Sequence, residues 1–340
     1  IVEARRLVRD WNLPEPRAWI TSVGTEIYVE RAGELVLDQT YADQISRDWL
    51  PEAIDRALAD VPGLVPQANY EQRTYKRSYY AESPELARSV DQRLQAAGIP
   101  ARVVFSHERL LDVLPRNAGK AAAMRHVAQS FAIPLERVFA AGDSGNDADM
   151  LSACRNAILV GNHAAEVASL AQRPNVYLAR RSHASGTLEG VLAHGADVHA
   201  RSVTRRRVFN MGGNRSAGSA SRGISLEQVE LGGSSPLLFA ARSGDLISAR
   251  LLLGAGADLN DRAADGNTPL LIATHSGHGS LAEFLLETGA DPNDSPLGYT
   301  ALHAAVLRGN LRDRERGVIL STSLWFKDKY SRISVFGLNK

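Results

Sequence analysis

This chain contains very little cysteine and no long apolar run. Its 340 residues include one cysteine, Cys154, which excludes an intramolecular disulfide and a zinc site built from cysteines. No apolar run approaches the roughly 20 residues that a membrane-spanning helix needs. The 39 Lys and Arg residues balance 38 Asp and Glu residues, so net charge provides no general attraction to nucleic acid or to an anionic membrane. We therefore expect a cytoplasmic protein with neither a nucleic-acid nor a membrane partner.

The first part of the chain, residues 1–190, alternates short β-rich runs with helical patterns. This alternation predicts an α/β domain with a largely parallel sheet. Two apolar runs, 138–141 and 157–160, each end at a Gly-containing turn and are the clearest candidates for buried strands. From about residue 26 to about residue 114 the pattern changes and tyrosines accumulate. That change predicts an α/β cap inserted into the domain.

Residues 191–233 differ from both neighbouring segments, because arginines lie there among Gly and Ser. A nucleic-acid-binding arm is one interpretation of the arginines. However, Phe209 is the one aromatic residue between 201 and 233, and single-strand binding surfaces place aromatic side chains among their cations. A flexible linker is therefore the favoured prediction.

A sequence repeat occupies residues 234–311. Ser-Pro-Leu-Leu at 235–238 recurs 33 residues later as Thr-Pro-Leu-Leu at 268–271, and Thr-Ala-Leu-His at 300–303 follows after 32 more. This period and this motif resemble the ankyrin repeat. Pro269 can begin a helix that Thr268 caps, because the first helical position needs no N–H donor. The resemblance predicts a small all-α segment that presents a surface to a protein partner.

The repeat is incomplete at both of its edges. Residues 192–198 look like the end of an ankyrin unit with no matching first helix before it. The third copy stops after one helix, and residues 312–340 match no pattern and stay unassigned. The two complete copies are fewer than the roughly three that a stable array needs. Taken alone, the segment is a weak candidate for a binding module.

The sharpest local motif is Gly-Asp-Ser-Gly-Asn-Asp at 142–147, between an apolar strand and a helical run. A strand-to-helix turn presents short polar side chains at the carboxyl edge of a parallel sheet, where ligands bind in such folds. Asp143 and Asp147, with Asn146 beside them, offer the oxygen ligands that Mg²⁺ prefers. The alternative is an acidic turn that only caps the next helix.

A lysine that lies 23 residues before Asp143 favours the metal interpretation. Lys120 opens a predicted helix after Asn117-Ala118-Gly119. Its ammonium group and the helix N-terminus can both neutralise a phosphate.

Lys120 and the 142–147 turn together resemble the third and fourth motifs of the haloacid dehalogenase superfamily. The run Asp-Val-Leu-Pro at 112–115 resembles the members of that superfamily that carry a large α/β cap. Further segments resemble the sucrose-phosphate phosphatases: residues 19–28, residues 75–80, Gly161-Asn162-His163 with Glu166, and residues 183–186. The resemblance spans roughly residues 1–190 and implies a parallel-sheet phosphatase core with an inserted α/β cap. The same domain also forms the C-terminal part of some sucrose-phosphate synthases.

The resemblance implies a role for each matching position. Asp143 and Asp147 would hold Mg²⁺, and Asn146 would help to order the ligands around it. Lys120 would stabilise the nucleophile and the transferring phosphoryl group by its positioned charge. The implied substrate contacts are Glu26, Lys76 and Tyr79 in the cap, with Asn162 near the site. For the three cap residues, ordinary packing or surface exposure stays open as the alternative.

The family's nucleophile motif is missing. In the superfamily an aspartate in an Asp-x-Asp-x-Thr pattern attacks phosphorus and forms an aspartyl-phosphate, and no such pattern occurs in this sequence. Residues 2–7 resemble the helix that follows the second motif. The resemblance therefore implies a truncated core whose first two motifs lie upstream of Ile1, and we expect little or no phosphatase activity from these residues alone.

Three functions stay open at this stage. The first is an Mg²⁺-dependent phosphatase of a sugar phosphate, with sucrose 6-phosphate as the leading substrate. The second is a protein-binding module formed by the ankyrin repeats. The third is the phosphatase-like domain of a sucrose-phosphate synthase.

Overall fold

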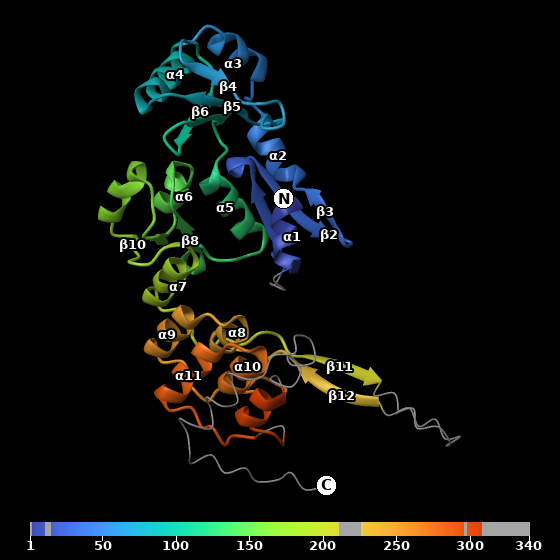
Figure 1. Ribbon diagram of the computed structural model, residues 1–340. Helices are drawn as coiled ribbons and strands as arrows, with labels where there is room; N and C mark the ends of the chain where they lie inside the picture. Colours follow the sequence, from blue (N-terminus) through green and yellow to red (C-terminus); the bar gives the residue numbers. More distant parts are fainter. Residues whose placement is uncertain (1, 11–14, 211–225, 296–297, 308–340) are drawn as a thin grey trace, which may run out of the picture. The chain divides into compact units, whose positions relative to one another are not determined.

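The computed structural model describes residues 2–10, 15–210, 226–295 and 298–307 (Figure 1). The chain forms two compact units, Ile1–His194 and Gly195–Lys340. In the described ranges, no helix has both the length and the apolar character that crossing a membrane would require.

The first unit begins with a helix and a small antiparallel sheet. Strands β1 (Ala18–Thr21), β2 (Glu26–Arg31) and β3 (Glu34–Leu37) pair in the order β1-β2-β3. Helix α1 (Val2–Asp10) precedes this sheet, and helix α2 (Gln39–Ser46) follows it. Between β1 and β2 the chain makes a short helical turn, η1 (Ser22–Gly24), in which Val23 has a positive φ of 58°.

The cap is a four-stranded antiparallel sheet with two helices beside it (Figure 1). The strands pair in the order β4-β5-β7-β6: β4 (Leu64–Pro66), β5 (Arg77–Ala81), β7 (Leu110–Pro115) and β6 (Ala101–Ser106). Helices α3 (Pro51–Leu58) and α4 (Pro84–Ala96) pack on one face of the sheet through an apolar cluster that includes Ile54, Tyr79, Val90, Leu111 and Val113. Because side chains alternate along a strand, the opposite face carries Ser78 and Asp112.

The segment expected to form the cap, 26–114, is divided between two apolar clusters. Strand β2 and helix α2 contribute Ile27, Tyr41 and Ile45 to a cluster that includes Ala123 of helix α5 (Lys120–Ser130). The separate cluster of the cap begins with Trp49 and Ile54. The pairing of β2 with β1 explains this division, since it fixes residues 26–29 to the strand that precedes them.

The remainder of the first unit is a parallel sheet flanked by helices (Figure 1). Strands β8 (Phe139–Gly142), β9 (Asn156–Leu159) and β10 (Val176–Leu178) pair in parallel in the order β10-β9-β8. Among them lie η2 (Leu135–Arg137), η3 (Gly145–Asp147), α6 (Ala148–Ala153), η4 (Ala165–Gln172) and α7 (His183–Ala193). The strands expected at 138–141 and 157–160 and the helix expected at Lys120 are confirmed. Strand β9 is largely buried, as expected, whereas in β8 Ala140 is buried and Phe139 is 40% exposed. In the described part of the chain, β8 pairs only with β9 and β1 pairs only with β2.

Asp38 joins three elements of the first unit. Its Oδ1 accepts a hydrogen bond from the Tyr41 N–H at the start of α2 (3.0 Å), and its Oδ2 lies 3.1 Å from Nε2 of His126 on α5. Burial acts to raise the pKa of Asp38, but the hydrogen bonds from Tyr41 and His126, with the nearby positive charges, outweigh it and hold the pKa below the ordinary 3.8.

We expect Asp38→Ala to lower the free energy of unfolding by about 1–2 kcal/mol, because the helix loses its N-cap. The stabilising carboxylate has a lowered pKa in the folded state. Its contribution is therefore present at neutral pH and is lost as the pH falls through that pKa. Thermal unfolding of the wild type and of Asp38→Ala between pH 7 and pH 3 measures this contribution. The difference in Tm between the two proteins should become smaller toward pH 3. Asp38→Asn can still cap the helix and should lose less stability than Asp38→Ala. A difference in Tm between the wild type and Asp38→Ala that increased at low pH would contradict the stabilising role of the Asp38 carboxylate.

The second unit contains paired helices. Helices α8 (Pro236–Ser243) and α9 (Leu246–Gly254) form one pair, and α10 (Pro269–Ser276) and α11 (Gly279–Thr288) form the next. Thr268 caps α10 by accepting a hydrogen bond from the Leu271 N–H (3.2 Å), as the sequence predicts. Gly244 and Gly277 end α8 and α10 in the left-handed conformation, with φ of 73° and 82°, which is the common glycine C-cap. The all-α repeat is therefore confirmed.

The segment expected to be a flexible linker contains a strand pair. Strands β11 (Arg205–Asn210) and β12 (Leu226–Leu231) are antiparallel. Two backbone hydrogen bonds join the segments that flank this strand pair. The Ser202 N–H donates to the Ser234 carbonyl (3.0 Å), and the Gly233 N–H donates to the Ser202 carbonyl (3.1 Å). The unassigned tail, 312–340, lies outside the described residues.

Candidate active site

The turn after β8 gathers the carboxylates that the sequence singles out. Asp147 is buried, and its Oδ2 accepts hydrogen bonds from the N–H groups of Asp143 (3.1 Å) and Ser144 (3.4 Å). Gly142 makes room for this arrangement, because a Cβ on it would lie 2.5 Å from the Cβ of Asp147. The turn therefore folds back on itself at the carboxyl edge of the parallel sheet, where ligands bind in α/β folds.

Lys120 reaches this turn from the first residue of α5. Its Nζ donates hydrogen bonds to Oδ1 of Asn146 and to Oδ1 of Asp147, both at 2.5 Å. The Lys120 side chain as a whole is about a quarter exposed, so the protein does not enclose it completely. The structure thus brings Lys120, Asn146 and Asp147 into direct contact across 27 residues of sequence.

Gly24 allows the backbone of the η1 turn to lie close against the start of α5. Its carbonyl accepts hydrogen bonds from the Gly119 N–H (3.4 Å) and the Tyr41 hydroxyl (2.6 Å). A Cβ on Gly24 would lie 2.3 Å from the Gly119 carbonyl carbon, and φ at Gly24 is +86°. A side chain there would displace backbone, so only glycine fits beside Lys120.

The donors around the turn fit part of an Mg²⁺ site. The Asp143 carboxylate makes no hydrogen bond or ion pair within the described ranges, and Asp147 and Asn146 add further oxygen atoms. Carboxylate and amide oxygens with several waters are the usual ligands of Mg²⁺. In the same ranges no group of three or more His, Cys, Asp or Glu side chains converges. A third carboxylate ligand would have to come from elsewhere.

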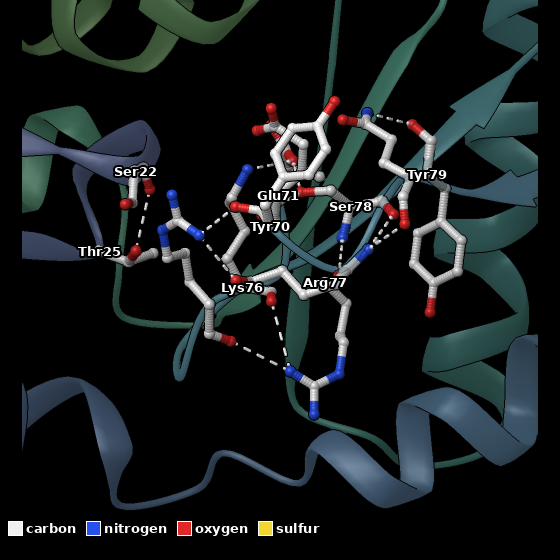
Figure 2. Close-up of polar contacts among 12 residues, drawn as sticks. Ser22, Thr25, Tyr70, Glu71, Lys76, Arg77, Ser78 and Tyr79 are labelled. Atoms are coloured by element: carbon white, nitrogen blue, oxygen red, sulfur yellow. Dashed lines mark hydrogen bonds and ion pairs between the residues drawn. The ribbon is translucent and has the colours of Figure 1, made fainter. Parts of the chain in front are cut away.

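A polar hollow of about 330 Å³ lies between the core and the cap. It is lined by Thr21, Ser22, Glu26, Tyr28, Glu71, Arg73 and Lys76. Glu26 is anchored there, since its Oε2 accepts hydrogen bonds from Ser22 Oγ (2.9 Å) and Thr21 Oγ1 (3.3 Å). Burial and the neighbouring Glu26 charge raise the pKa of the Tyr28 hydroxyl. Figure 2 shows Glu71 and Lys76 of the cap and Ser22 of the core, which line this hollow.

Lys76 forms a buried ion pair in the cap. Its Nζ donates to Oδ1 of Asp112 at 3.1 Å, and the Ser78 hydroxyl donates to the same oxygen at 2.6 Å. The side chains of Lys76 and Asp112 are 9% and 10% exposed. The pair fixes the lysine at the wall of the hollow.

A family model described as sucrose-6F-phosphate phosphohydrolase matches residues 1–195, which is more than half of the chain. This chain belongs to the sucrose-6F-phosphate phosphohydrolase family. The membership confirms the resemblance that rests on Lys120, the 142–147 turn and the cap segments. A second model, of ankyrin repeats in three copies, matches residues 227–313.

Curated relatives that match the first unit are phosphatases or related hydrolases. A putative haloacid-dehalogenase-like hydrolase of Nitrosococcus oceani is 35% identical, over 55% of this chain and 57% of that protein. A mannosylfructose-phosphate phosphatase of Agrobacterium fabrum is 30% identical, over 54% of this chain and 75% of that protein. A probable sucrose-phosphatase of Arabidopsis thaliana is 30% identical, over 44% of this chain and 36% of that protein. The matched segment thus covers less than two thirds of the Nitrosococcus and Arabidopsis proteins and three quarters of the Agrobacterium protein.

A solved structure supports the same fold for the first unit. The sucrose-phosphatase of Synechocystis, solved in complex with sucrose and phosphate, is 30% identical with a TM-score of 0.53. The match covers 57% of this chain and 80% of that one. The predicted fold class, a haloacid-dehalogenase-type α/β core with an α/β cap and an ankyrin segment, is therefore confirmed.

The other two predicted substrate contacts, Tyr79 and Asn162, do not line the hollow that Glu26 and Lys76 line. Tyr79 is buried in the cap cluster with its hydroxyl 3.5 Å from Oδ1 of Asp55, and burial raises its pKa to about 12. Figure 2 shows its ring directed away from Lys76. The structure does not bring Tyr79 to the hollow, because alternate residues of β5 face opposite sides of the sheet.

Asn162 lies on a loop that borders the 142–147 turn. The Ala164 N–H donates to the Asp143 carbonyl at 2.7 Å, which holds this loop beside the turn. The Asn162 side chain itself accepts a hydrogen bond from the His183 N–H at 2.8 Å. Asn162 therefore fixes the loop that begins α7 and lies near the site rather than inside the hollow.

Glu71 and Arg73 line the hollow but were not predicted from the sequence. Both lie in the irregular segment between β4 and β5, where no periodic pattern reports the direction of a side chain. Their closeness to residues 75–80, which carry the family resemblance, was the one available signal.

Proposed function

We propose that residues 1–195 provide the phosphate-binding and sugar-binding parts of an Mg²⁺-dependent phosphatase that hydrolyses a sugar phosphate. The observation that carries this proposal is the contact of Lys120 with Asn146 and Asp147 at the carboxyl end of β8. A fixed ammonium group beside carboxylates is the arrangement that stabilises a transferring phosphoryl group with the help of a metal ion.

Each residue of the turn has a distinct part in the proposal. Asp143 and Asp147 hold the metal ion, and the Asn146 amide helps to order the ligands around it. Bound Mg²⁺ would supply positive charge to the phosphate oxygens. Lys120 supplies a second positive charge, which its hydrogen bonds to Asn146 and Asp147 hold in place.

The nucleophile in this proposal is an aspartate of an Asp-x-Asp-x-Thr strand encoded upstream of Ile1. It attacks phosphorus, the bond from phosphorus to the sugar oxygen breaks, and that oxygen takes a proton from the second aspartate of the same motif. The second aspartate then accepts a proton from the water that hydrolyses the aspartyl-phosphate. The unpaired edges of β1 and β8 in the described part of the chain support this proposal, since they leave room for further strands in the core.

The hollow between core and cap is the proposed sugar site. Glu26, Glu71, Arg73 and Lys76 surround it with charged groups that can bind sugar hydroxyls. Sucrose 6-phosphate is the leading substrate because of the family match and the Synechocystis structure, and the Agrobacterium relative makes mannosylfructose phosphate the next candidate.

A phosphate-release assay on a panel of sugar phosphates tests the substrate. The protein is expressed with the natural coding sequence upstream of Ile1 and is assayed with Mg²⁺ on sucrose 6-phosphate, mannosylfructose phosphate and glucose 6-phosphate. We expect the highest kcat/KM for sucrose 6-phosphate. A preference for glucose 6-phosphate would contradict the disaccharide assignment. A glycosyltransferase domain in the upstream sequence would instead identify a sucrose-phosphate synthase.

The ankyrin repeats support a second candidate function. The family match over 227–313 and the paired helices α8–α11 are consistent with a protein-binding surface. If the protein released phosphate from no sugar phosphate but captured a specific protein through residues 234–311, this function would replace the first.

A further inference from the structure

The edge strand of the cap lies directly on the proposed metal-binding turn. Strand β6 is the last strand in the order β4-β5-β7-β6. A Cβ on Gly145 would lie 2.1 Å from the carbonyl oxygen of Phe105, near the end of β6. The cap and the turn are therefore in backbone contact, and only a glycine permits it.

One carboxylate oxygen binds both sides of this contact. Oε1 of Glu166 accepts a hydrogen bond from the Gly145 N–H at 2.5 Å and another from the His107 N–H at 3.1 Å. Gly145 lies in η3, one residue before Asn146, and His107 lies in the turn that joins β6 to β7. Glu166 thus connects the cap to the turn that carries Asn146 and Asp147.

A second carboxylate connects the other end of β6 to the residue next to Lys120. Oδ2 of Asp149 lies 3.1 Å from Nη1 of Arg102, near the start of β6. The same oxygen accepts a hydrogen bond from the Ala121 N–H at 3.1 Å. A carboxylate of the core therefore contacts each end of β6. Glu166 also binds the N–H of Gly145, next to Asn146, and Asp149 also binds the N–H of Ala121, next to Lys120.

We propose that Glu166 is a positioning residue that couples the docking of the cap to the geometry of the metal-binding turn. While the cap is docked, Glu166 holds Gly145 so that Asn146 and Asp147 face Lys120. When His107 moves away with the cap, the carboxylate loses one of its two donors and the turn loses a restraint. This inference rests on the proposed function for its catalytic consequence, whereas the structural coupling stands without it.

Amide hydrogen exchange on the 340-residue chain tests the coupling without any assay of activity. We compare the wild type with Glu166→Ala, with Glu166→Gln and with Glu136→Ala, which alters an exposed glutamate on η2. Glu166→Ala should speed exchange at both His107 and Gly145 by at least about tenfold, because both donors lose their acceptor. Glu166→Gln keeps the acceptor and should stay close to the wild type, as should Glu136→Ala. Faster exchange at only one of the two amides, or at neither, would overturn the coupling.

The catalytic consequence is tested in the protein that includes the upstream sequence. Glu166→Ala should raise the Mg²⁺ concentration for half-maximal activity by about 10-fold or more, which is typical for the loss of an outer ligand contact. The KM for the sugar phosphate should also rise, while the KM for p-nitrophenyl phosphate, which has no sugar for the cap to bind, should not. Glu166→Gln should restore both values. An unchanged Mg²⁺ requirement would overturn the positioning role. A wild type that releases no phosphate would refute the proposed function alone.

Discussion

Asp147→Asn should lower Mg²⁺-dependent phosphate release by at least about 100-fold, the scale seen when one positioned electrostatic group is removed from an active site. Asparagine keeps the size of the side chain and can still accept hydrogen bonds from the Asp143 and Ser144 N–H groups. It removes the charge that faces Lys120 and that would hold the metal ion in the proposed site. The measurement is the initial rate of phosphate release from sucrose 6-phosphate by the protein that includes the upstream sequence.

A matched control separates this effect from a general change of charge. Asp48→Asn removes an exposed carboxylate that lies outside both the turn and the hollow, and it should leave the rate unchanged. Circular dichroism and Tm should show that both variants are folded. If Asp147→Asn kept its rate within about twofold of the wild type, a loss below 1 kcal/mol, the assignment of the metal-binding turn would be wrong.

Lys76→Met should lower the free energy of unfolding of the cap by about 3–5 kcal/mol, because it leaves the buried Asp112 charge without its partner. The apolar stem of methionine fills much of the space that the lysine leaves. The remaining hydrogen bond from Ser78 to Asp112 cannot replace the lost positive charge. Urea unfolding measures the change, and the fluorescence of Trp49, which packs against the cap cluster, reports on this region.

An exposed ion pair in the same cap provides the control. Arg88 and Glu85 are 2.7 Å apart and 67% and 71% exposed, and exposed pairs contribute at most about 1 kcal/mol. Arg88→Met should therefore have little effect. Replacing both members of the buried pair, as Lys76→Met with Asp112→Leu, should recover part of the lost stability. A loss for Lys76→Met no larger than that for Arg88→Met would show that the pair does not stabilise the cap.

Local patterns were enough to predict the elements that carry the proposed phosphate site. The apolar runs at 138–141 and 157–160 form β8 and β9, and the helix at Lys120 forms α5. These predictions succeed because both strands are short apolar runs, of which β9 is largely buried, and because glycine-containing turns mark where they end. The turn at 142–147 was recognised from its own residues, whereas its pairing with Lys120, 27 residues away from Asp147, rested on the resemblance to the third and fourth superfamily motifs.

Contacts that depend on distant pairing could not be predicted in the same way. The pairing of Arg205 with Leu231 joins residues across a Gly-rich and Ser-rich segment that has no strand pattern of its own, so a linker was expected there. Tyr79 was placed in the sugar site by resemblance. The period of two along a strand puts it on the opposite face from Ser78, and in the structure it packs in the cap cluster. Glu71 and Arg73 reach the hollow through an irregular loop, whose path the sequence does not encode locally.

The most direct test of the account is phosphate release from sucrose 6-phosphate by the protein expressed with its natural upstream sequence, measured with Mg²⁺ and again after chelation by EDTA. The account predicts saturable release that EDTA abolishes and that added Mg²⁺ restores, with no such release from the 340-residue chain alone. Release that continues at the same rate after chelation, or none from any sugar phosphate while the Asp-x-Asp-x-Thr strand is present, would contradict it.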